Sequence, residues 1–336
     1  MDLGVSLLPE FNEMTNMKHL MKKYQAAATI ADKEGYHWFG MPNRLMPSWI
    51  DGNTAVLMTS YLAGFNFNIR FLLNMELGVD HPVRQASVVS VADVLTNGRV
   101  GFCLEMPDDG VLRKFGFDMQ GKARVNEASQ LFNSALAERN LSYKGKIFET
   151  NGFTLSPPPV QFPAPDFYYR CYSEADVLLA AQRGWGINLP VYEFPNPDHA
   201  ANLTQLYRNQ LPREVRGKVS LMLFASIGEE VNQGRVSEEI QKYFLSLLER
   251  GGSMTESRKN GWERIAENPQ SMIDRSLIGS VQDTRSQLNE WFQSLQPDVL
   301  FIVPVPGLGE GESAVTIHRM RQEVMPIYYP AGGASA

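Results

Sequence analysis

The chain has only two cysteines among its 336 residues, Cys103 and Cys171, and they lie far apart in no spacing typical of a metal site. Two cysteines in a chain of this length do not make a disulfide framework, so we expect a reducing, cytoplasmic environment. The sequence also lacks an apolar run long enough to span a membrane. Its first residues lack the basic start and long apolar core of a signal peptide, and we therefore expect no membrane attachment.

An excess of charge of one sign is missing as well. The chain carries 31 Lys and Arg against 37 Asp and Glu, a formal net charge of -6. This mild acidic excess offers no electrostatic footprint for a nucleic-acid backbone, so no nucleic-acid partner is expected. A convincing dinucleotide-binding fingerprint is absent too. The glycine-rich stretch at 307–311 is interpreted as a turn, with a phosphate cradle as the alternative, because Glu310 and Glu312 would repel an anion.

What the sequence does contain is an alternation of short apolar runs with longer amphipathic ones, which is typical of parallel βα units. Hydrophobic residues make up 43% of the chain, enough to bury a full core. Eight strands are predicted, at residues 3–8, 36–41, 67–75, 100–104, 167–171, 185–189, 219–225 and 299–303. A closed (β/α)8 barrel and an open doubly wound sheet fit this alternation nearly equally well, and periodicity does not choose between them.

Three segments depart from the alternation. Residues 140–165 form a proline-rich insertion before the fifth strand. Residues 251–277 are polar, contain glycine and are weakly periodic, and we predict a lid loop there because long loops in compact domains are commonly lids. Residues 328–336 are interpreted as a flexible tail. The remainder, residues 1–327, is predicted to form one domain.

One helix has clear signals at both ends. Pro82 stands where the first helical turn should begin, a position at which a missing N–H costs nothing. The pair Asn97-Gly98 is a good signal for the end of the same helix. We therefore predict a helix from Pro82 to Leu95, followed directly by the fourth strand.

This region also carries a family resemblance. The stretch His81-Pro-Val-Arg-Gln-Ala86, followed by Asp93-Val-Leu-Thr-Asn-Gly-Arg99, resembles the bacterial luciferase-like flavin monooxygenases. Weaker matches to that family lie in the same order along residues 1–327, at Gly35-Tyr36, Lys114-Phe-Gly116, Ala180-Ala-Gln-Arg-Gly184, Ile278-Gly279 and Val324-Met-Pro326. The resemblance implies a single (β/α)8 barrel and decides the choice that periodicity left open.

The resemblance also implies a chemistry. Members of this family use reduced FMN, usually supplied by a separate flavin reductase, and activate O2 as a flavin hydroperoxide to oxidise a small organic substrate. They usually pair through helices on one side of the barrel, which implies a homodimer or heterodimer here.

The family's histidine near the reactive edge of the flavin has no counterpart in this chain. The position falls on Arg44 by one count and on Asn43 by another, and these are the candidate catalytic residues. An arginine stays protonated, so Arg44 cannot be a general base, although it could bind an anionic substrate or a peroxide. A surface arginine on a loop is the alternative interpretation.

The residues that would bind the FMN phosphate are also changed. Met106 stands at a phosphate-binding arginine of the family and cannot pair with a phosphate, which leaves Arg113 and Arg124 as candidate replacements. Ser173 matches the serine whose helix N-terminus holds the phosphate. However, Ser173-Glu-Ala-Asp176 is also a capping box, the same pattern as Ser280-Val-Gln-Asp283, and this structural interpretation is slightly favoured.

The remaining site candidates lie at the ends of strands, where barrel active sites form. Asn74, Glu105 and Tyr172 are predicted to contact the cofactor, and Arg170 and Phe71 to line the substrate pocket. Cys103 is expected to be a buried packing residue.

Three functions remain open. The first is a two-component monooxygenase using reduced FMN and O2. The second is a non-catalytic or flavin-free barrel acting as a partner subunit, which the missing histidine, Met106 and Asp176 favour. The third is a deazaflavin-dependent oxidoreductase of the same superfamily.

Overall fold

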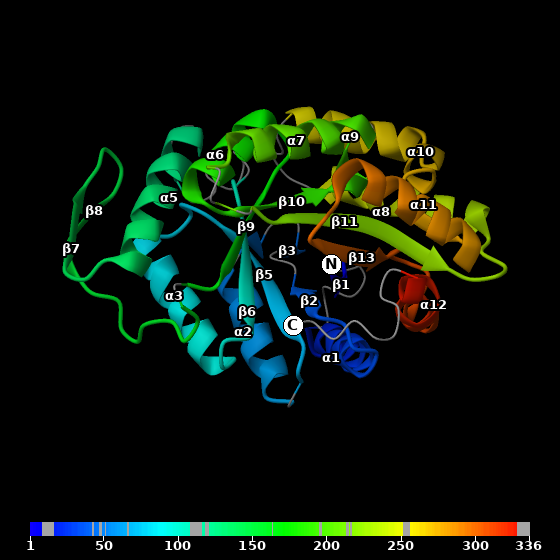
Figure 1. Cartoon of the computed structure of the whole chain (residues 1–336), viewed down its shortest axis with the longest axis horizontal. Coiled ribbons are helices and arrows are strands. Elements are labelled where there is room, and N and C mark those ends of the chain that lie inside the picture. Colours follow the sequence, from blue (N-terminus) through cyan, green and yellow to red (C-terminus); the bar gives the residue numbers. More distant parts are fainter. Residues whose placement is uncertain are drawn as a thin grey trace.

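The computed structural model describes residues 1–8, 17–41, 44–46, 49–50, 52–65, 67–107, 116–117, 121–162, 164–194, 197–212, 215, 217–250 and 256–327. Eight parallel strands form its centre, with helices around them (Figure 1). The strands are β1 (Asp2–Ser6), β2 (Trp38–Met41), β5 (Arg70–Glu76), β6 (Val100–Glu105), β9 (Asp166–Arg170), β10 (Gly186–Pro190), β11 (Val219–Ile227) and β13 (Val299–Pro304). All eight predicted strands are therefore present.

The sheet closes on itself. Each strand pairs in parallel with the next one along this series, β10 pairs with β11, and β13 pairs with β1. A sheet with no free edge is a barrel, so the predicted (β/α)8 barrel is confirmed and the open doubly wound sheet is excluded.

Helices cover the outside of the barrel. They are α1 (Met17–Lys33), α2 (Gly52–Ala63), α3 (Pro82–Leu95), α5 (Gly121–Ala137), α6 (Glu174–Arg183), α7 (Pro197–Gln210), α8 (Gln233–Arg250), α11 (Val281–Leu295) and α12 (Glu310–Arg319). Short helical turns follow β10 and α12, at η1 (Val191–Glu193), η2 (Met320–Val324) and η3 (Met325–Ile327). Among the described residues, no helix combines the length and the apolar character that crossing a membrane requires.

Helix α3 has the predicted bounds. Pro82 is its first residue, and the His81 ring accepts a hydrogen bond from the Val83 N–H at 3.4 Å. After the helix, Gly98 adopts φ +74°, a left-handed conformation that favours glycine. Its N–H donates to the Asp93 carbonyl, which ends the helix and turns the chain into β6.

The proline-rich insertion contains an antiparallel hairpin that the sequence analysis did not predict. Strands β7 (Leu141–Lys144) and β8 (Glu149–Phe153) pair with each other and project from the barrel beside α5 (Figure 1). The later part of the insertion runs along α3, where the Asp93 carboxylate accepts hydrogen bonds from the backbone N–H and side-chain amide of Gln161.

The prediction of a lid loop at 251–277 is wrong for residues 256–277, the part of this segment that the structure describes. Residues 256–277 contain α9 (Glu256–Glu267), α10 (Gln270–Ile273) and the start of β12 (Leu277–Gly279), which pairs with the end of β11. Trp262 and Ile265 of α9 are 3% and 2% exposed. The remaining residues of α9 are mostly polar or charged, so its narrow apolar face gave little periodic signal. Residues 251–255 and the predicted tail at 328–336 lie outside the described residues.

The core has two parts. One lies between the strands and the surrounding helices, and the other fills the barrel and continues beneath α8 and α9. Successive side chains on a strand point to opposite faces, so alternate residues of each strand enter the barrel. Gly101 provides room for one of them, because a Cβ there would come within 3.1 Å of the Trp38 ring.

Candidate functional site

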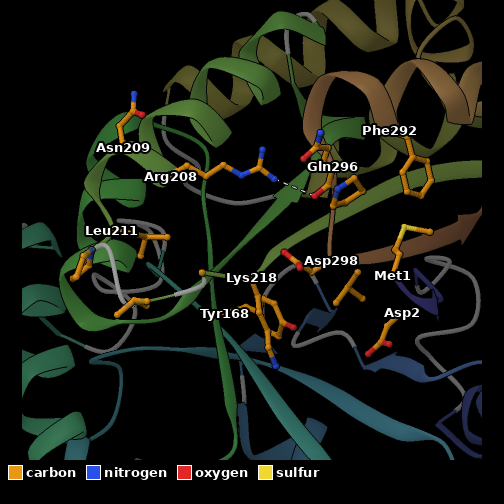
Figure 2. A pocket seen from close by; sticks show the side chains of 15 residues that line it. Met1, Asp2, Tyr168, Arg208, Asn209, Leu211, Lys218, Phe292, Gln296 and Asp298 are labelled. Carbon is orange, nitrogen blue, oxygen red and sulfur yellow. Dashed lines mark hydrogen bonds between the residues drawn. The ribbon is translucent and has the colours of Figure 1, made fainter. Parts of the chain in front are cut away.

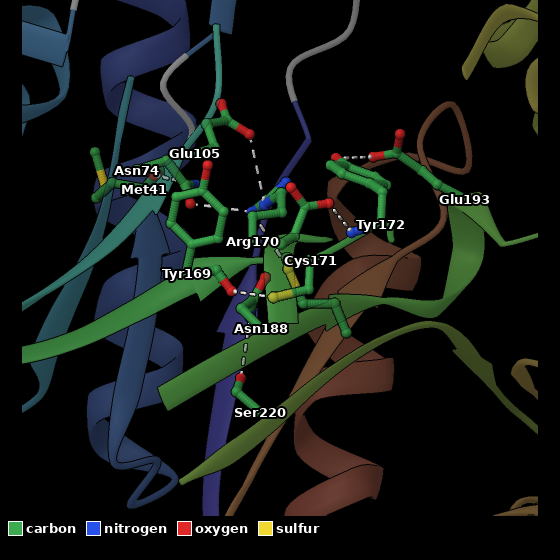
Figure 3. A network of polar contacts seen from close by, with 12 residues as sticks. Met41, Asn74, Glu105, Tyr169, Arg170, Cys171, Tyr172, Asn188, Glu193 and Ser220 are labelled. Atoms are coloured by element: carbon green, nitrogen blue, oxygen red, sulfur yellow. Dashed lines mark hydrogen bonds and ion pairs between the residues drawn. The ribbon is translucent and has the colours of Figure 1, made fainter. Parts of the chain in front are cut away.

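A buried polar network lies at the carboxyl end of β9, where barrel active sites form (Figure 3). Arg170 is 8% exposed, and its Nη2 donates to Asn74 Oδ1 at 3.0 Å. Its Nε lies 3.7 Å from Glu105 Oε2, and its Nη2 lies 3.6 Å from Met222 Sδ. The structure therefore brings together three residues predicted for the site, Asn74, Glu105 and Arg170, from three adjacent strands.

The network is acidic around a single guanidinium. Glu76 and Glu105 are cross-strand neighbours on β5 and β6, and each is 3% exposed. Burial opposes the charge on Arg170, but Cys103, Tyr172 and Glu105 together raise the pKa of Arg170 above its ordinary value. The guanidinium therefore stays charged and compensates the Glu105 carboxylate, which would be costly to bury without it.

The neighbouring groups are held in place as well. Asn74 Nδ2 donates to the Met41 carbonyl at 2.9 Å, which fixes the amide that receives Arg170. Burial raises the pKa of Cys103 to about 11, so its thiol stays protonated and is no nucleophile near neutral pH. The expectation that Cys103 is a buried packing residue is confirmed.

The N-terminus of α6 is capped by the side chain of Asp176, a residue of its first turn. Asp176 Oδ2 accepts hydrogen bonds from the Tyr172 N–H at 3.0 Å, the Ser173 N–H at 2.9 Å and the Ser173 hydroxyl at 2.8 Å. Burial raises the pKa of Asp176, and these three hydrogen bonds oppose that shift. The structure therefore agrees with the capping-box interpretation of Ser173, because the Asp176 carboxylate binds back to the N–H and the hydroxyl of Ser173.

Tyr172 forms hydrogen bonds with residues of η1 and α7, which follow β10. Its hydroxyl donates to Glu193 Oε1 at 3.4 Å, and Trp262 Nε1 of α9 donates to Glu193 Oε2 at 3.1 Å. Its carbonyl lies 2.8 Å from His199 Nε2 of α7. Beside this group, Tyr192 stacks on Phe224 with ring centroids 4.9 Å apart. Helix α9 and the η1 turn thus pack over this side of the barrel mouth.

Arg124 is engaged in packing. Its Nε donates to the Gly78 carbonyl at 2.6 Å. Its guanidinium lies over the Phe117 ring at 3.8 Å and over the Phe148 ring at 4.7 Å. These contacts place Arg124 beside the turn after β5 and account for the residue without a ligand.

Phe71 is the site prediction that the structure contradicts. Its side chain is fully buried between the strands and the outer helices, in contact with Phe39 and Phe67. Asn74 faces the barrel interior, and residues three apart on a regular strand face opposite sides. Phe71 therefore does not line a pocket inside the barrel.

Three other candidates cannot be placed. Asn43 and Arg113 lie outside the described residues, and Arg44 is described only as the first residue of the short strand β3 (Arg44–Met46), which pairs with β4 (Trp49–Ile50). The possible phosphate cradle at 307–311 is a turn, in which Gly307 and Gly309 have φ +89° and +98°. A small pocket of about 290 Å³ adjoins it, where Arg235 forms an ion pair with Glu312.

FMN does not fit the described part of the mouth in the way the family resemblance implied. A phosphate at the N-terminus of α6 would meet the Asp176 carboxylate, which already accepts hydrogen bonds from the N–H groups of Tyr172 and Ser173. No cluster of three or more His, Cys, Asp or Glu suited to a metal ion occurs among the described residues.

Sequence reasoning missed Glu76, Glu193 and Trp262. Glu76 ends a strand two residues after Asn74, and this period of two was a usable signal. Glu193 and Trp262 are 69 residues apart in the sequence, and nothing in their spacing pointed to their contact.

Comparisons with known proteins agree with this architecture. The model of the family described as luciferase-like monooxygenase matches residues 1–297. The crystal structure of monooxygenase RslO1 from Streptomyces bottropensis is similar with a TM-score of 0.75 and 18% identity, covering 98% of this chain and 100% of that chain.

Two further structures show the range of cofactors on this fold. The oxygenating constituent of 3,6-diketocamphane monooxygenase from Pseudomonas putida, in complex with FMN, has a TM-score of 0.73 and 14% identity, covering 97% and 98% of the two chains. The coenzyme F420 dependent tetrahydromethanopterin reductase from Methanopyrus kandleri has a TM-score of 0.70 and 15% identity, covering 97% and 99%. Such identities establish the fold and leave the cofactor open. By the match over most of its length, this chain belongs to the luciferase-like monooxygenase family.

Proposed function

We propose that this chain is a flavin-free luciferase-like barrel that acts as the non-catalytic partner of a flavin-dependent subunit. The observation that carries the proposal is the Asp176 carboxylate at the N-terminus of α6, held by three hydrogen bonds of 2.8–3.0 Å. A carboxylate in this place repels a phosphate and already binds the hydroxyl of Ser173 and the N–H groups of Tyr172 and Ser173. The Arg170 network supports the proposal, because its bonded side chains are buried at the carboxyl ends of β5, β6 and β9.

An exposed apolar surface supports the role as a partner subunit. It lies on the adjacent helices α2 and α3, on the turn that follows α2, and on the part of the 140–165 insertion that runs along α3. We call it the α2–α3 face. Its largest exposed side chains are Leu57, Tyr61, Phe65, Val91, Leu95 and Phe162. Contiguous apolar patches are uncommon on monomers and often mark protein interfaces. We expect the flavin-dependent subunit, a second luciferase-like barrel, to cover this face in a heterodimer, and a second copy of this chain to cover it when that subunit is absent.

An anaerobic titration with reduced FMN tests the flavin-free state. We expect no change in flavin absorbance or fluorescence with protein at high micromolar concentration. Saturable binding at these concentrations would overturn the proposal. A second measurement, sedimentation of the Leu57→Asp/Leu95→Asp variant beside the unmodified chain, tests the α2–α3 face, and an unchanged dimer would rule this face out.

The second candidate is a two-component monooxygenase that receives reduced FMN from a flavin reductase and oxidises a small organic substrate with O2. Arg124 favours it, because this cation lies beside the turn after β5 at the carboxyl end of the barrel. It predicts saturable binding of reduced FMN and consumption of O2. Binding of a reduced deazaflavin without oxygen consumption would instead identify a hydride-transferring member of the superfamily.

A further inference from the structure

A large pocket lies at the amino end of the barrel, opposite the Arg170 network. Its volume is about 920 Å³. The starts of β1, β11 and β13 and the ends of α7 and α11 surround it (Figure 2). Leu211, Phe292 and Val299 give it an apolar part, while Asp2 and Lys218 are among its charged lining residues. A concave site with an apolar wall and a few polar groups is the usual form of a small-molecule site.

Tyr168 lines this pocket, and its buried hydroxyl has no hydrogen-bond partner among the described residues. Tyr168 is 2% exposed, and its hydroxyl makes no hydrogen bond with any described residue. Gly186 on the adjacent strand makes room for the ring, since a Cβ there would lie 2.8 Å from Tyr168 Cδ1. A buried phenol hydroxyl normally finds a partner. The orphaned hydroxyl therefore points to a ligand group in the pocket.

The charges around this hydroxyl favour a positive ligand. Burial raises the pKa of Tyr168 well above its ordinary value, and Asp166, Asp2 and Asp298 raise it further against the opposing effect of Arg70. The hydroxyl therefore stays protonated in a negative electrostatic environment. Figure 2 shows its oxygen on the side of the pocket toward Asp2 and Asp298.

The basic side chains that line the pocket, Lys218 and Arg208, form an ion pair and hydrogen bonds within the protein. Lys218 Nζ lies 2.6 Å from Asp166 Oδ1. Arg208 Nη2 donates to the carbonyls of Leu295 at 2.7 Å and Gln296 at 3.0 Å. Asp2 accepts a hydrogen bond from the neutral Trp38 indole at 3.0 Å and forms no ion pair with a described residue. Its negative charge remains available to a cation.

We propose that this pocket binds a small organic ammonium ion, a protonated primary amine with a short apolar tail. The ammonium group binds the Asp2 carboxylate. It also donates a hydrogen bond from one of its N–H groups to the oxygen of the Tyr168 hydroxyl. The tail lies against Leu211, Phe292 and Val299. This site is independent of the flavin question, because it lies at the opposite end of the barrel.

Saturation-transfer NMR on the full chain tests the site with n-butylammonium as the probe. Butyrate and n-butanol, which have the same tail and a different head group, are the matched ligands. We expect saturable binding of n-butylammonium and at least about tenfold weaker binding of the other two, since a charge-assisted hydrogen bond is stronger than a neutral one. Equal binding of butyrate or butanol, or no saturation at all, would overturn the proposal.

Two variants locate the binding site. In Asp2→Asn the side chain still accepts the Trp38 bond but loses its charge, and we expect about tenfold weaker binding of n-butylammonium. In Tyr168→Phe the ring is kept and the hydroxyl is lost, which should weaken binding about threefold. Asp80→Asn removes a carboxylate from the turn after β5, at the other end, and should leave binding unchanged. Equal losses in Asp2→Asn and Asp80→Asn would disprove the assignment.

Discussion

Helices α6 and α11 begin with the same motif, a serine followed three residues later by an aspartate that binds back to it. Asp283 accepts hydrogen bonds from the N–H and hydroxyl of Ser280 at 3.0 and 2.7 Å, much as Asp176 does from Ser173. The surroundings differ. Burial raises the pKa of Asp176, whereas Asp283 is exposed and the Ser280 hydroxyl and N–H lower its pKa.

This difference shows what a capping motif decides and what it leaves open. The four residues organise the helix start in both places. Only at α6 does the motif stand at the end of β9, beside the buried Arg170 network, where the family resemblance implies a flavin phosphate. The same side chain is therefore an ordinary cap in α11, whereas in α6 we propose that it also acts as a barrier to anions.

The largest effect on stability is expected from the Arg170 network beneath α6. No comparable network is described beneath α11. Arg170→Met removes the guanidinium 3.7 Å from Glu105 Oε2. We expect the free energy of unfolding to fall by about 3–5 kcal/mol, because breaking a buried ion pair leaves a carboxylate in a low-dielectric site. Denaturant unfolding measures the loss.

A double variant separates charge from packing at this site. Arg170→Met/Glu105→Gln should recover part of the loss, since the remaining side chain carries no charge. A double variant less stable than either single variant would contradict the view that Arg170 acts by compensating Glu105.

The next effect concerns anion binding at the two helix starts. Asp176→Ser frees the N–H groups of Tyr172 and Ser173 and removes a negative charge, so we expect reduced FMN to bind at least about tenfold more tightly than to the unmodified chain. The measurement is the anaerobic flavin titration. Asp283→Ser makes the same change at α11 and should not alter FMN binding. An equal gain in both variants would refute a special role for α6.

The smallest effects on stability are expected at the C-terminal ends of α6 and α11, which resemble each other in backbone conformation. Gly184 after α6 and Gln296 after α11 both adopt left-handed conformations, with φ +70° and +44°. Gly184→Ala should lower the free energy of unfolding by about 1 kcal/mol, because an L side chain is strained there. Gln296→Gly should raise it by about 0.5 kcal/mol for the same reason. Thermal unfolding of both variants measures the pair, and a stabilised Gly184→Ala would contradict this account.

The strands and most of the helices were predictable from local signals, whereas closure into a barrel was predicted only from the family resemblance. Helix α3 has its predicted bounds because Pro82, Asn97 and Gly98 act through their own backbone conformations. Helix α9 was missed because its stability comes from burying Trp262 and Ile265 against α8 and the barrel, a contact that its own sequence does not announce.

The site was predictable only in part. Asn74, Glu105 and Arg170 were identified because they lie at strand ends, but the bond between Asn74 and Arg170 joins residues 96 positions apart. Phe71 was placed wrongly because a strand alternates its two faces, so an odd shift from Asn74 moves a side chain out of the barrel.

The sequence by itself determined the βα alternation, the α3 boundaries and the capping boxes, since each depends on residues close together along the chain. The tertiary structure decided which capping aspartate is buried, which side chains meet Arg170, and that Tyr168 faces a pocket without a partner. Burial and long-range contact set the cost of a charge or an unmade hydrogen bond, and neither quantity exists until the strands have closed into a barrel.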